Sequence, residues 1–334
     1  MARLGHLLLL LPAALLIAAS PSTEGLGPNL ERFDYPHPVQ RFAVPGGDSS
    51  ASIAYMDIRP ARPNGRTVVL LHGKNFCGAT WGDTADKLVA AGYRVVVPDQ
   101  LGFCKSAKPA GFQYSFHGLA ELDIRLLDSL GIDRFVLVGH SMGGILATRL
   151  ALLHPERVEQ LVLVNPLAVG DWVAEGAPYA DLPALRREEE ATTSESIRAY
   201  QRANYYHGNW RPEYDRWVAM LAGMYVGPGK ATVVEAQARA SEMIESQPVA
   251  SEFPRLRMPT TFMIGMQDTT AFGRARAPAA MRSRIPAVPA LARRIADGMS
   301  DARLIPFDDL GHSPQVEAPA RFQAALLDLL AARS

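Results

Sequence analysis

Short apolar runs alternate with longer segments of helical periodicity through the middle of the chain. The runs are rich in valine and leucine, which is typical of strands covered on both faces. They lie at residues 67–71, 94–97, 135–138 and 160–164, and the helical segments between them lie at 81–91, 115–130 and 145–153. Strands that alternate with helices predict a mostly parallel sheet flanked by helices, the α/β class.

The same pattern returns near the end of the chain, and a different one precedes it. Strands are predicted at residues 261–264 and 303–306, followed by a terminal helix at 319–332. Residues 39–44 and 51–58 alternate between apolar and polar positions, which indicates a strand pair joined by a turn at 45–48. The sheet is therefore expected to carry an antiparallel pair at its start.

The alternation stops between the two halves. Residues 195–206, 212–225 and 229–246 all have helical spacing, with no convincing strand between them. This predicts an all-helical cap, or lid, at residues 167–254. The cap would divide the α/β core into a first part, 23–166, and a second part, 255–334. The cap is rich in tryptophan and tyrosine, and most of these rings are expected to hold its helices together.

Composition and charge narrow the classes of partner. The chain has 334 residues, 48% of them hydrophobic, and 34 basic side chains against 34 acidic ones. A large core is possible, and no net field is present to hold nucleic acid or an anionic membrane. A small-molecule partner is expected instead.

The first residues and the two cysteines indicate an exported protein. Residues 1–22 combine Arg3 with an apolar run shorter than the roughly 20 residues of a membrane-spanning helix, so they are interpreted as a signal peptide. No later run is long and apolar enough to span a bilayer. A periplasmic or secreted chain permits a disulfide, and Cys77 and Cys104 lie in loops after neighbouring predicted strands. We predict that they are bridged; two free, half-buried thiols are the alternative.

The strand at 135–138 runs into Gly139-His140-Ser141-Met142-Gly143, and a helix follows. A Gly-x-Ser-x-Gly turn between a strand and a helix exposes the serine as a nucleophile, with glycines where a Cβ would collide with a neighbouring strand or helix. The backbone amide of Met142 then lies at a helix N-terminus, where it can donate to an oxyanion. Ser141 is the candidate nucleophile.

A serine nucleophile needs a general base and a carboxylate that orients it. His312 follows the last predicted strand and precedes the terminal helix, and Asp268 follows the strand at 261–264. The chain order serine, aspartate, histidine is the one expected for this architecture. Among the other candidates, His140 is interpreted as structural, and Asp99 as a residue that braces loops.

The second oxyanion donor is expected just after His72-Gly73, at the backbone amide of Lys74, with Asn75 as the alternative. His72 should hydrogen-bond within its own loop. The side chain of Lys74 is expected to point to solvent, and recognition of a substrate carboxylate is the alternative. No two histidines have ligand spacing, so neither a metal nor a cofactor is predicted.

These motifs together resemble the α/β-hydrolase superfamily, in particular its lidded Ser-His-Asp branch of esterases, lipases, peptidases and carbon–carbon bond hydrolases. The resemblance covers nearly the whole mature chain and implies the roles given above for Ser141, Asp268, His312, Met142 and Lys74. Two features depart from the family pattern. Cys104 stands where a glycine is usual, and residues 269–300 are longer than usual.

The resemblance also implies an activity. The serine in the Gly-x-Ser-x-Gly turn excludes the haloalkane dehalogenase and epoxide hydrolase relatives, which have an aspartate at that position. Met142, the residue after the serine, disfavours the proline iminopeptidases. Carbon–carbon hydrolases of ring-cleavage products act on substrates formed in the cytoplasm, so export of the chain disfavours this activity without excluding it. The expected function is a serine hydrolase, carboxylesterase- or lipase-like, for small to medium apolar or aromatic esters. The alternatives are a carbon–carbon hydrolase, an aminopeptidase or a non-catalytic binder of a hydrophobic ligand.

Overall fold

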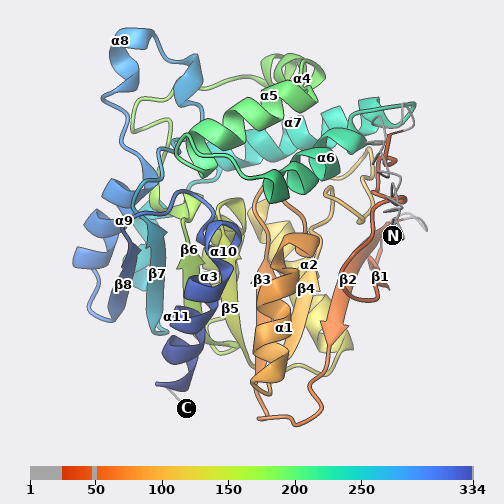
Figure 1. Cartoon of the computed structure of the whole chain (residues 1–334), viewed down its shortest axis with the longest axis vertical. Helices are drawn as coiled ribbons and strands as arrows, with labels where there is room; N and C mark the ends of the chain where they lie inside the picture. The colour runs from red at the N-terminus through yellow and green to blue at the C-terminus, as the bar shows by residue number, and fades with distance from the viewer. Residues whose placement is uncertain (1–24, 47–50, 333–334) are drawn as a thin grey trace, which may run out of the picture.

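An eight-stranded sheet forms the centre of the computed structural model, which describes residues 25–46 and 51–332 (Figure 1). The strand order is β1-β2-β4-β3-β5-β6-β7-β8. β1 and β2 pair antiparallel, β2 joins β4 antiparallel, and all other neighbours are parallel. The predicted mostly parallel sheet is confirmed. Its strands are β1 (Gln40–Ala43), β2 (Ser52–Ile58), β3 (Thr67–Leu71), β4 (Arg94–Pro98), β5 (Phe135–His140), β6 (Val158–Val164), β7 (Thr260–Gly265) and β8 (Ala302–Phe307).

Helices cover both faces of the sheet because successive strand residues point to opposite sides and both sets are apolar. Val68 and Leu70 of β3 belong to one buried cluster with residues of α1 (Gly82–Ala90) and α11 (Pro319–Ala331). Val69 and Leu71 belong to another with residues of α2 (Phe116–Ser129), α3 (Met142–Leu153) and α9 (Val288–Asp297). The continuous apolar runs of the sequence are thus explained by burial on two sides.

Between β6 and β7 the described chain contains helices and loops but no strand, and these helices lie above the sheet in Figure 1. They are α4 (Leu182–Glu190), α5 (Ser194–Tyr200), the π-helical turn η3 (Gln201–Tyr205), α6 (Asp215–Met224) and α7 (Lys230–Ser246), with short 3₁₀ turns η2 (Leu167–Val169), η4 (Pro212–Tyr214) and η5 (Ala250–Arg255). Two differences from the sequence prediction stand out. The sequence analysis did not predict α4, and the helix predicted at 195–206 ends as the π turn.

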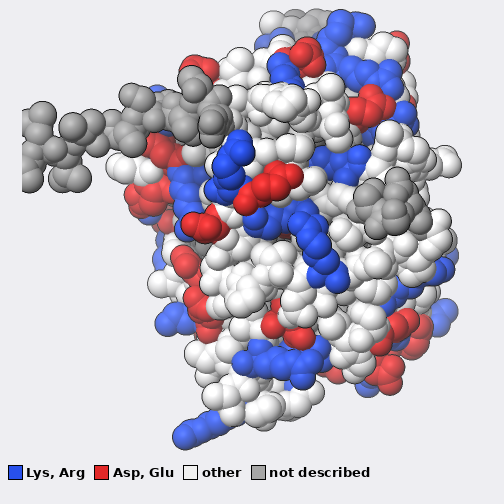
Figure 2. Space-filling model, turned by 90° about the vertical axis from the view of Figure 1, so that its right-hand side faces the viewer, with Lys and Arg blue, Asp and Glu red and all other residues white. Residues whose placement is uncertain are grey.

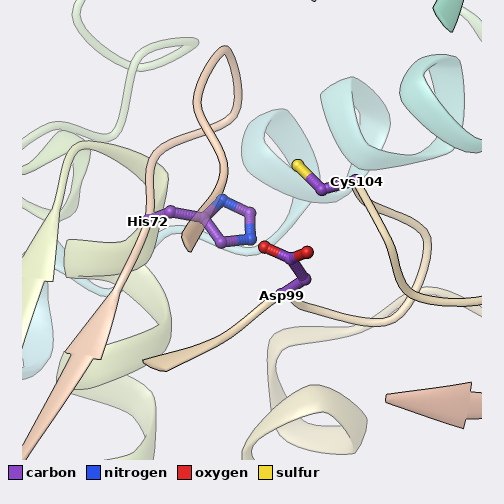
Figure 3. A group of neighbouring side chains, drawn as sticks. All are labelled: His72, Asp99 and Cys104. Carbon is purple, nitrogen blue, oxygen red and sulfur yellow. The ribbon is translucent and has the colours of Figure 1, made fainter. Parts of the chain in front are cut away.

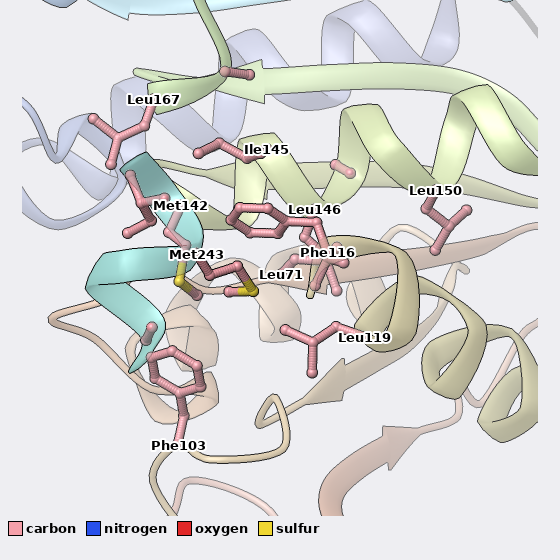
Figure 4. Packing of buried hydrophobic residues seen from close by; sticks show 14 of the residues in the cluster. Leu71, Phe103, Phe116, Leu119, Met142, Ile145, Leu146, Leu150, Leu167 and Met243 are labelled. Carbon is pink, nitrogen blue, oxygen red and sulfur yellow. The ribbon is translucent and has the colours of Figure 1, made fainter. Parts of the chain in front are cut away.

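The helix α7 joins this group of helices to the core beneath it. Its Met243 lies in one buried cluster with Met142, which follows Ser141, and with Phe103 and Leu71 (Figure 4). Met243 is 1% exposed and Met142 is fully buried. The apolar floor of the helical group is therefore continuous with the turn that carries the serine.

The segment after Asp268, expected from the sequence to be long, holds two helices. These are α8 (Ala279–Arg282) and α9, preceded by the 3₁₀ turn η6 (Arg274–Arg276). Of these, α9 buries Val288, Leu291 and Ala292 against the sheet side. No element was predicted here from the sequence.

A disulfide joins Cys77 and Cys104, with Cα atoms 5.7 Å apart. It links the loop after β3 to the loop after β4, as predicted. Cys104 has a φ of 48°, the left-handed region that glycine occupies most easily. At this position, where the sequence comparison with the family expected a glycine, the bridged cysteine thus holds a backbone conformation that glycine adopts most easily.

Loss of this bridge should reduce stability. Replacing both residues, Cys77→Ser with Cys104→Ser, removes a cross-link over a sequence separation of 27 residues. The chain-entropy model assigns such a loop about 3.5 kcal/mol. Urea unfolding of the double variant should show a correspondingly lower free energy of unfolding. Alkylation of two cysteines in the unreduced wild-type protein, seen by mass spectrometry, would contradict the bridge.

A buried carboxyl on α2 should make stability depend on pH. Asp123 is 1% exposed, and neither carboxyl oxygen has a hydrogen-bond partner among the described residues. Burial raises its pKa from 3.8 to about 8, with the neighbouring Gln100 offsetting part of the shift. The folded state therefore binds this proton more tightly than the unfolded state. The stability it contributes is complete below the unfolded pKa and is lost as pH rises toward 8, by at most about 1.4 kcal/mol per pH unit.

Asp123→Asn should remove this pH dependence, because the amide mimics the neutral acid and carries no charge. The variant's gain in Tm over wild type should be larger at pH 8 than at pH 5. Asp128→Asn, on the same helix beside Arg157 at the surface, is the control and should show no such growth. An equal difference at both pH values for Asp123→Asn would contradict the assignment.

The surface carries both signs of charge. Figure 2 shows basic and acidic side chains interspersed over one face, in keeping with the formal net charge of +0. In the described ranges no helix is long and apolar enough to cross a bilayer. The predicted signal peptide at 1–22 lies outside the described residues, as does part of the turn predicted at 45–48.

Candidate active site

Ser141 lies at a sharp turn between β5 and α3. Its φ and ψ are 55° and −120°, a strained conformation for a residue with a side chain. The turn is tight enough that a Cβ at Gly139 would lie 2.3 Å from the Gly143 carbonyl oxygen, and one at Gly143 would lie 2.6 Å from that of Leu71. The collisions expected from the sequence are therefore real, and both glycines are required by close backbone approach.

The structure brings Ser141, His312 and Asp268 together. His312 Nε2 lies 2.9 Å from Ser141 Oγ, and His312 Nδ1 lies 2.7 Å from Asp268 Oδ2. All three side chains are buried. With the proton on Nδ1 donated to Asp268, Nε2 is free to accept the serine proton, which is the arrangement a general base needs.

Asp268 is held by more than the histidine. Its Oδ2 also accepts from Asn165 Nδ2 at 2.9 Å, and its Oδ1 accepts from the Thr270 amide at 2.7 Å. The Oδ1 of Asn165, in turn, accepts from the Gly265 amide at the end of β7. These donors fix the orientation of the carboxylate that faces His312. Sequence reasoning missed Asn165; its place at the end of β6, just before Pro166, was the available signal.

A tyrosine of the π turn covers the histidine. The ring of Tyr205 lies 4.6 Å from that of His312, centroid to centroid, and its carbonyl accepts from the His312 amide at 2.9 Å. Asn75 Nδ2 donates to the Tyr205 hydroxyl at 3.0 Å. The proposed base is thereby shielded from water by a residue that the sequence analysis did not single out.

The competing histidines have structural positions. His140 donates from Nε2 to the His312 carbonyl at 2.9 Å, and burial, then the neighbouring His312, holds its pKa well below the ordinary value. His72 donates from Nδ1 to the Gly73 carbonyl and accepts the Gln100 amide at Nε2. Burial lowers its pKa as well. Both rings are neutral braces, as interpreted from the sequence.

His72, Asp99 and Cys104 approach one another closely enough to suggest metal ligands (Figure 3). The chemistry of this set does not fit a metal. The sulfur of Cys104 is in the disulfide, and both ring nitrogens of His72 are already hydrogen-bonded. Asp99 accepts from the Gly78 amide at 2.7 Å, the Lys105 amide at 3.0 Å and the Tyr35 hydroxyl at 2.6 Å, so it braces loops as expected.

Two backbone amides are placed to stabilise an oxyanion. Met142 begins α3, and the loop of Lys74 passes directly against the serine, since a Cβ at Gly73 would lie 2.9 Å from Ser141 Cβ. Within the described residues, neither the Met142 nor the Lys74 amide donates to a protein acceptor. Free amides beside a nucleophile are the donors that an oxyanion needs.

The side chain of Lys74 does not point to solvent, so that prediction was wrong. Its Nζ pairs with Glu189 Oε1 of α4 at 2.6 Å, and both side chains are only 12% exposed. The reason is α4 itself, which was not predicted and which places a carboxylate over the loop. The substrate contact considered as the alternative is thus occupied by a residue of the chain.

A cavity of about 490 Å³ lies between these helices and the segment after Asp268. We call it the cap cavity; it is lined by Lys74, Asn75, Glu188, Glu189, Thr192, Ser196, Ile197, Tyr200, Gln201, Leu221, Tyr225, Ser241, Ala271, Phe272, Gly273, Ala275 and Arg276. Its lining includes Lys74 and Asn75, from the loop that lies against Ser141, and does not include Ser141 itself.

A second hollow lies at the other end of the sheet. It measures about 600 Å³ and is lined by Thr67 and Arg94, which begin β3 and β4. Because Ser141 follows the carboxyl end of β5, this hollow is remote from the candidate site.

The fold and the buried serine, histidine and aspartate define the class of hydrolytic enzymes built on this sheet. Residues 66–319 match the family model described as the alpha/beta hydrolase fold. The chain belongs to the α/β-hydrolase fold family and is a hydrolase. The resemblance found from the sequence motifs is confirmed.

Relatives support this assignment at different levels. A probable hydrolytic enzyme from Pseudomonas aeruginosa PAO1 is 49% identical, with a TM-score of 0.89, over 92% of this chain and 99% of that one. A 2-hydroxymuconate semialdehyde hydrolase from Pseudomonas sp. (strain CF600) is 28% identical over 80% of this chain and 87% of its own length. The enol-lactonase from Burkholderia xenovorans LB400 is 22% identical, with a TM-score of 0.67 over 87% of this chain and 100% of that one, which shows a shared fold.

Proposed function

We propose that this hydrolase is a serine esterase that cleaves carboxylic esters through an acyl-enzyme. The observation that carries the proposal is the 2.9 Å approach of Ser141 Oγ to His312 Nε2, with Asp268 bound to the other ring nitrogen. Ser141 Oγ attacks the ester carbonyl while His312 takes its proton. His312 then returns this proton to the leaving alcohol as the carbon–oxygen bond breaks.

Water completes the cycle. It attacks the acyl-enzyme, His312 accepts its proton, and the proton passes to Ser141 Oγ as the acid leaves. In both halves the negative carbonyl oxygen would lie against the amides of Met142 and Lys74. The size of the cap cavity, about 490 Å³, supports a small to medium ester.

A carbon–carbon bond hydrolase is the second candidate. It is favoured by the 28% identical relative, a 2-hydroxymuconate semialdehyde hydrolase, which aligns over most of both chains. The same serine and histidine could serve that reaction, so the distinction lies in the substrate. An aminopeptidase or a non-catalytic binder has no specific observation in its favour.

Pre-steady-state kinetics test the proposal. Mixed with p-nitrophenyl acetate, the enzyme should release a burst of p-nitrophenol close to one equivalent, followed by a slower steady rate set by deacylation. A series of longer p-nitrophenyl esters should then show a limit of chain length set by the cap cavity. Absence of p-nitrophenol release from every ester, together with cleavage of a carbon–carbon bond in an unsaturated diketone that carries a carboxylic acid, would favour the second candidate.

We propose further that the protein works outside the cytoplasm, in the periplasm or as a secreted enzyme. The apolar start of the chain supports this, and so does the Cys77–Cys104 disulfide, since such bonds persist in oxidising compartments.

A further inference from the structure

Ion pairs neutralise the cations that line the cap cavity. Lys74 Nζ lies 2.6 Å from one carboxyl oxygen of Glu189, and the other oxygen accepts from the Tyr225 hydroxyl at 2.6 Å. These three residues come from the loop after β3, from α4 and from the end of α6. Glu189 is therefore held from two directions, and the ammonium group of Lys74 is paired with a carboxylate of the protein rather than free for a substrate anion.

Arg276, which also lines the cavity, is likewise paired with carboxylates of the protein. Its Nε and one terminal nitrogen bind the two carboxyl oxygens of Glu188 at 2.7 and 3.0 Å, and its other terminal nitrogen binds Glu245. Glu245 is buried and also accepts from the Ala180 amide at 3.0 Å. A two-pronged carboxylate pair is the strongest way to hold an arginine in place.

The charge balance around the cavity is therefore unfavourable for an anion. Two cations, Lys74 and Arg276, meet three carboxylates, those of Glu188, Glu189 and Glu245. A substrate carboxylate entering here would find no free cation and would have to displace a carboxylate of the protein. Like charges brought together in a partly buried site are strongly unfavourable.

One neutral polar group in the wall has no partner. Gln201 is fully buried, and both its amide nitrogen and its amide oxygen lack a hydrogen bond within the described chain. It lies in the π turn that also carries Tyr205, and such turns often occur at functional sites. Buried polar groups are normally paired, so this amide has hydrogen-bonding capacity that a ligand group can satisfy when the side chain turns toward the cavity. A hydroxyl can both donate to and accept from an amide.

We propose that the cap cavity selects uncharged esters whose buried part carries a hydroxyl or a carbonyl group, which Gln201 binds, and that the pairing of Lys74 with Glu189 excludes substrates with a carboxylate there. This inference rests on the proposed esterase activity and adds the class of substrate.

Three p-nitrophenyl esters with acyl chains of equal length test this inference. The acyl chain ends, away from the ester bond, in a methyl, a hydroxyl or a carboxylate group. In the wild-type enzyme kcat/KM for the hydroxyl ester should exceed that for the methyl ester by about tenfold. It should exceed that for the carboxylate ester by at least about 100-fold.

Two variants separate the roles. Glu189→Gln frees Lys74, so the ratio of carboxylate to methyl ester rates should rise at least about tenfold. Glu190→Gln is the matched control: it removes a charge from the next residue, which pairs with Lys230 outside the cavity wall, and should leave the ratio unchanged. Gln201→Leu should lower the ratio of hydroxyl to methyl ester rates by about tenfold.

Equal wild-type rates for the three esters, or an unchanged carboxylate ratio in Glu189→Gln, would overturn the inference while leaving the esterase proposal intact. Absence of turnover with all three esters would instead overturn the esterase proposal. In that case isothermal titration calorimetry measures the affinity of the protein for the same three esters. The inference requires the hydroxyl ester to bind most tightly. Equal affinities, or tighter binding of the carboxylate ester, would contradict the inference.

Discussion

Replacement of Ser141 by alanine is expected to lower kcat/KM for a short p-nitrophenyl ester by roughly 10⁴- to 10⁶-fold, because no acyl-enzyme can form without the hydroxyl. The amides of Met142 and Lys74 remain, so a small rate above uncatalysed hydrolysis should persist. Steady-state release of p-nitrophenol measures both values.

The control for this variant is another serine. Ser129→Ala changes a residue at the end of α2 whose hydroxyl binds the Leu126 carbonyl, far from the site, and should leave the rate unchanged. Thermal unfolding of both variants separates loss of chemistry from loss of fold. Retention of most of the wild-type rate in folded Ser141→Ala would assign the activity to another nucleophile.

Asp268→Asn should lower kcat by about 10⁴-fold at neutral pH while the protein stays folded. The amide would donate to His312 Nδ1, which forces the ring proton to Nε2, so Nε2 could no longer accept from Ser141. The geometry of the three side chains would change little, and KM should change less than kcat. Initial rates over a range of ester concentrations separate the two constants.

Asp309→Asn is the matched control, because Asp309 lies close to His312 in sequence but pairs with Arg321 at the surface. It should retain nearly the wild-type kcat. A larger loss in Asp309→Asn than in Asp268→Asn would contradict the assignment of the orienting carboxylate.

The parts of the fold that could be predicted are those with a local signature. The strands of the core are continuous apolar runs because they are covered on both faces, and the turn at Ser141 is marked by glycines that close contact requires. By contrast, α4 buries only Leu185 and so presents no apolar stripe to detect. Its start did carry a signal, since the Asp181 side chain caps it and Pro183 follows.

The contacts that complete the site could not be read from local pattern. Asn165 reaches Asp268 across a separation of 103 residues, and Lys74 reaches Glu189 across 115. The pairing of β6 with β7 brings Asn165 to Asp268, and the packing of α4 over the loop after β3 brings Glu189 to Lys74. The missing α4 therefore led directly to the wrong expectation for Lys74. The signal peptide and the export of the protein stay predictions.

Reaction with a fluorophosphonate probe, followed by peptide mass spectrometry, tests the central claim most directly. One adduct per chain is expected, on Ser141; it should form slowly in His312→Ala and be absent in Ser141→Ala. An unlabelled wild-type protein, or an adduct on any other residue, would contradict a serine esterase built on Ser141, His312 and Asp268.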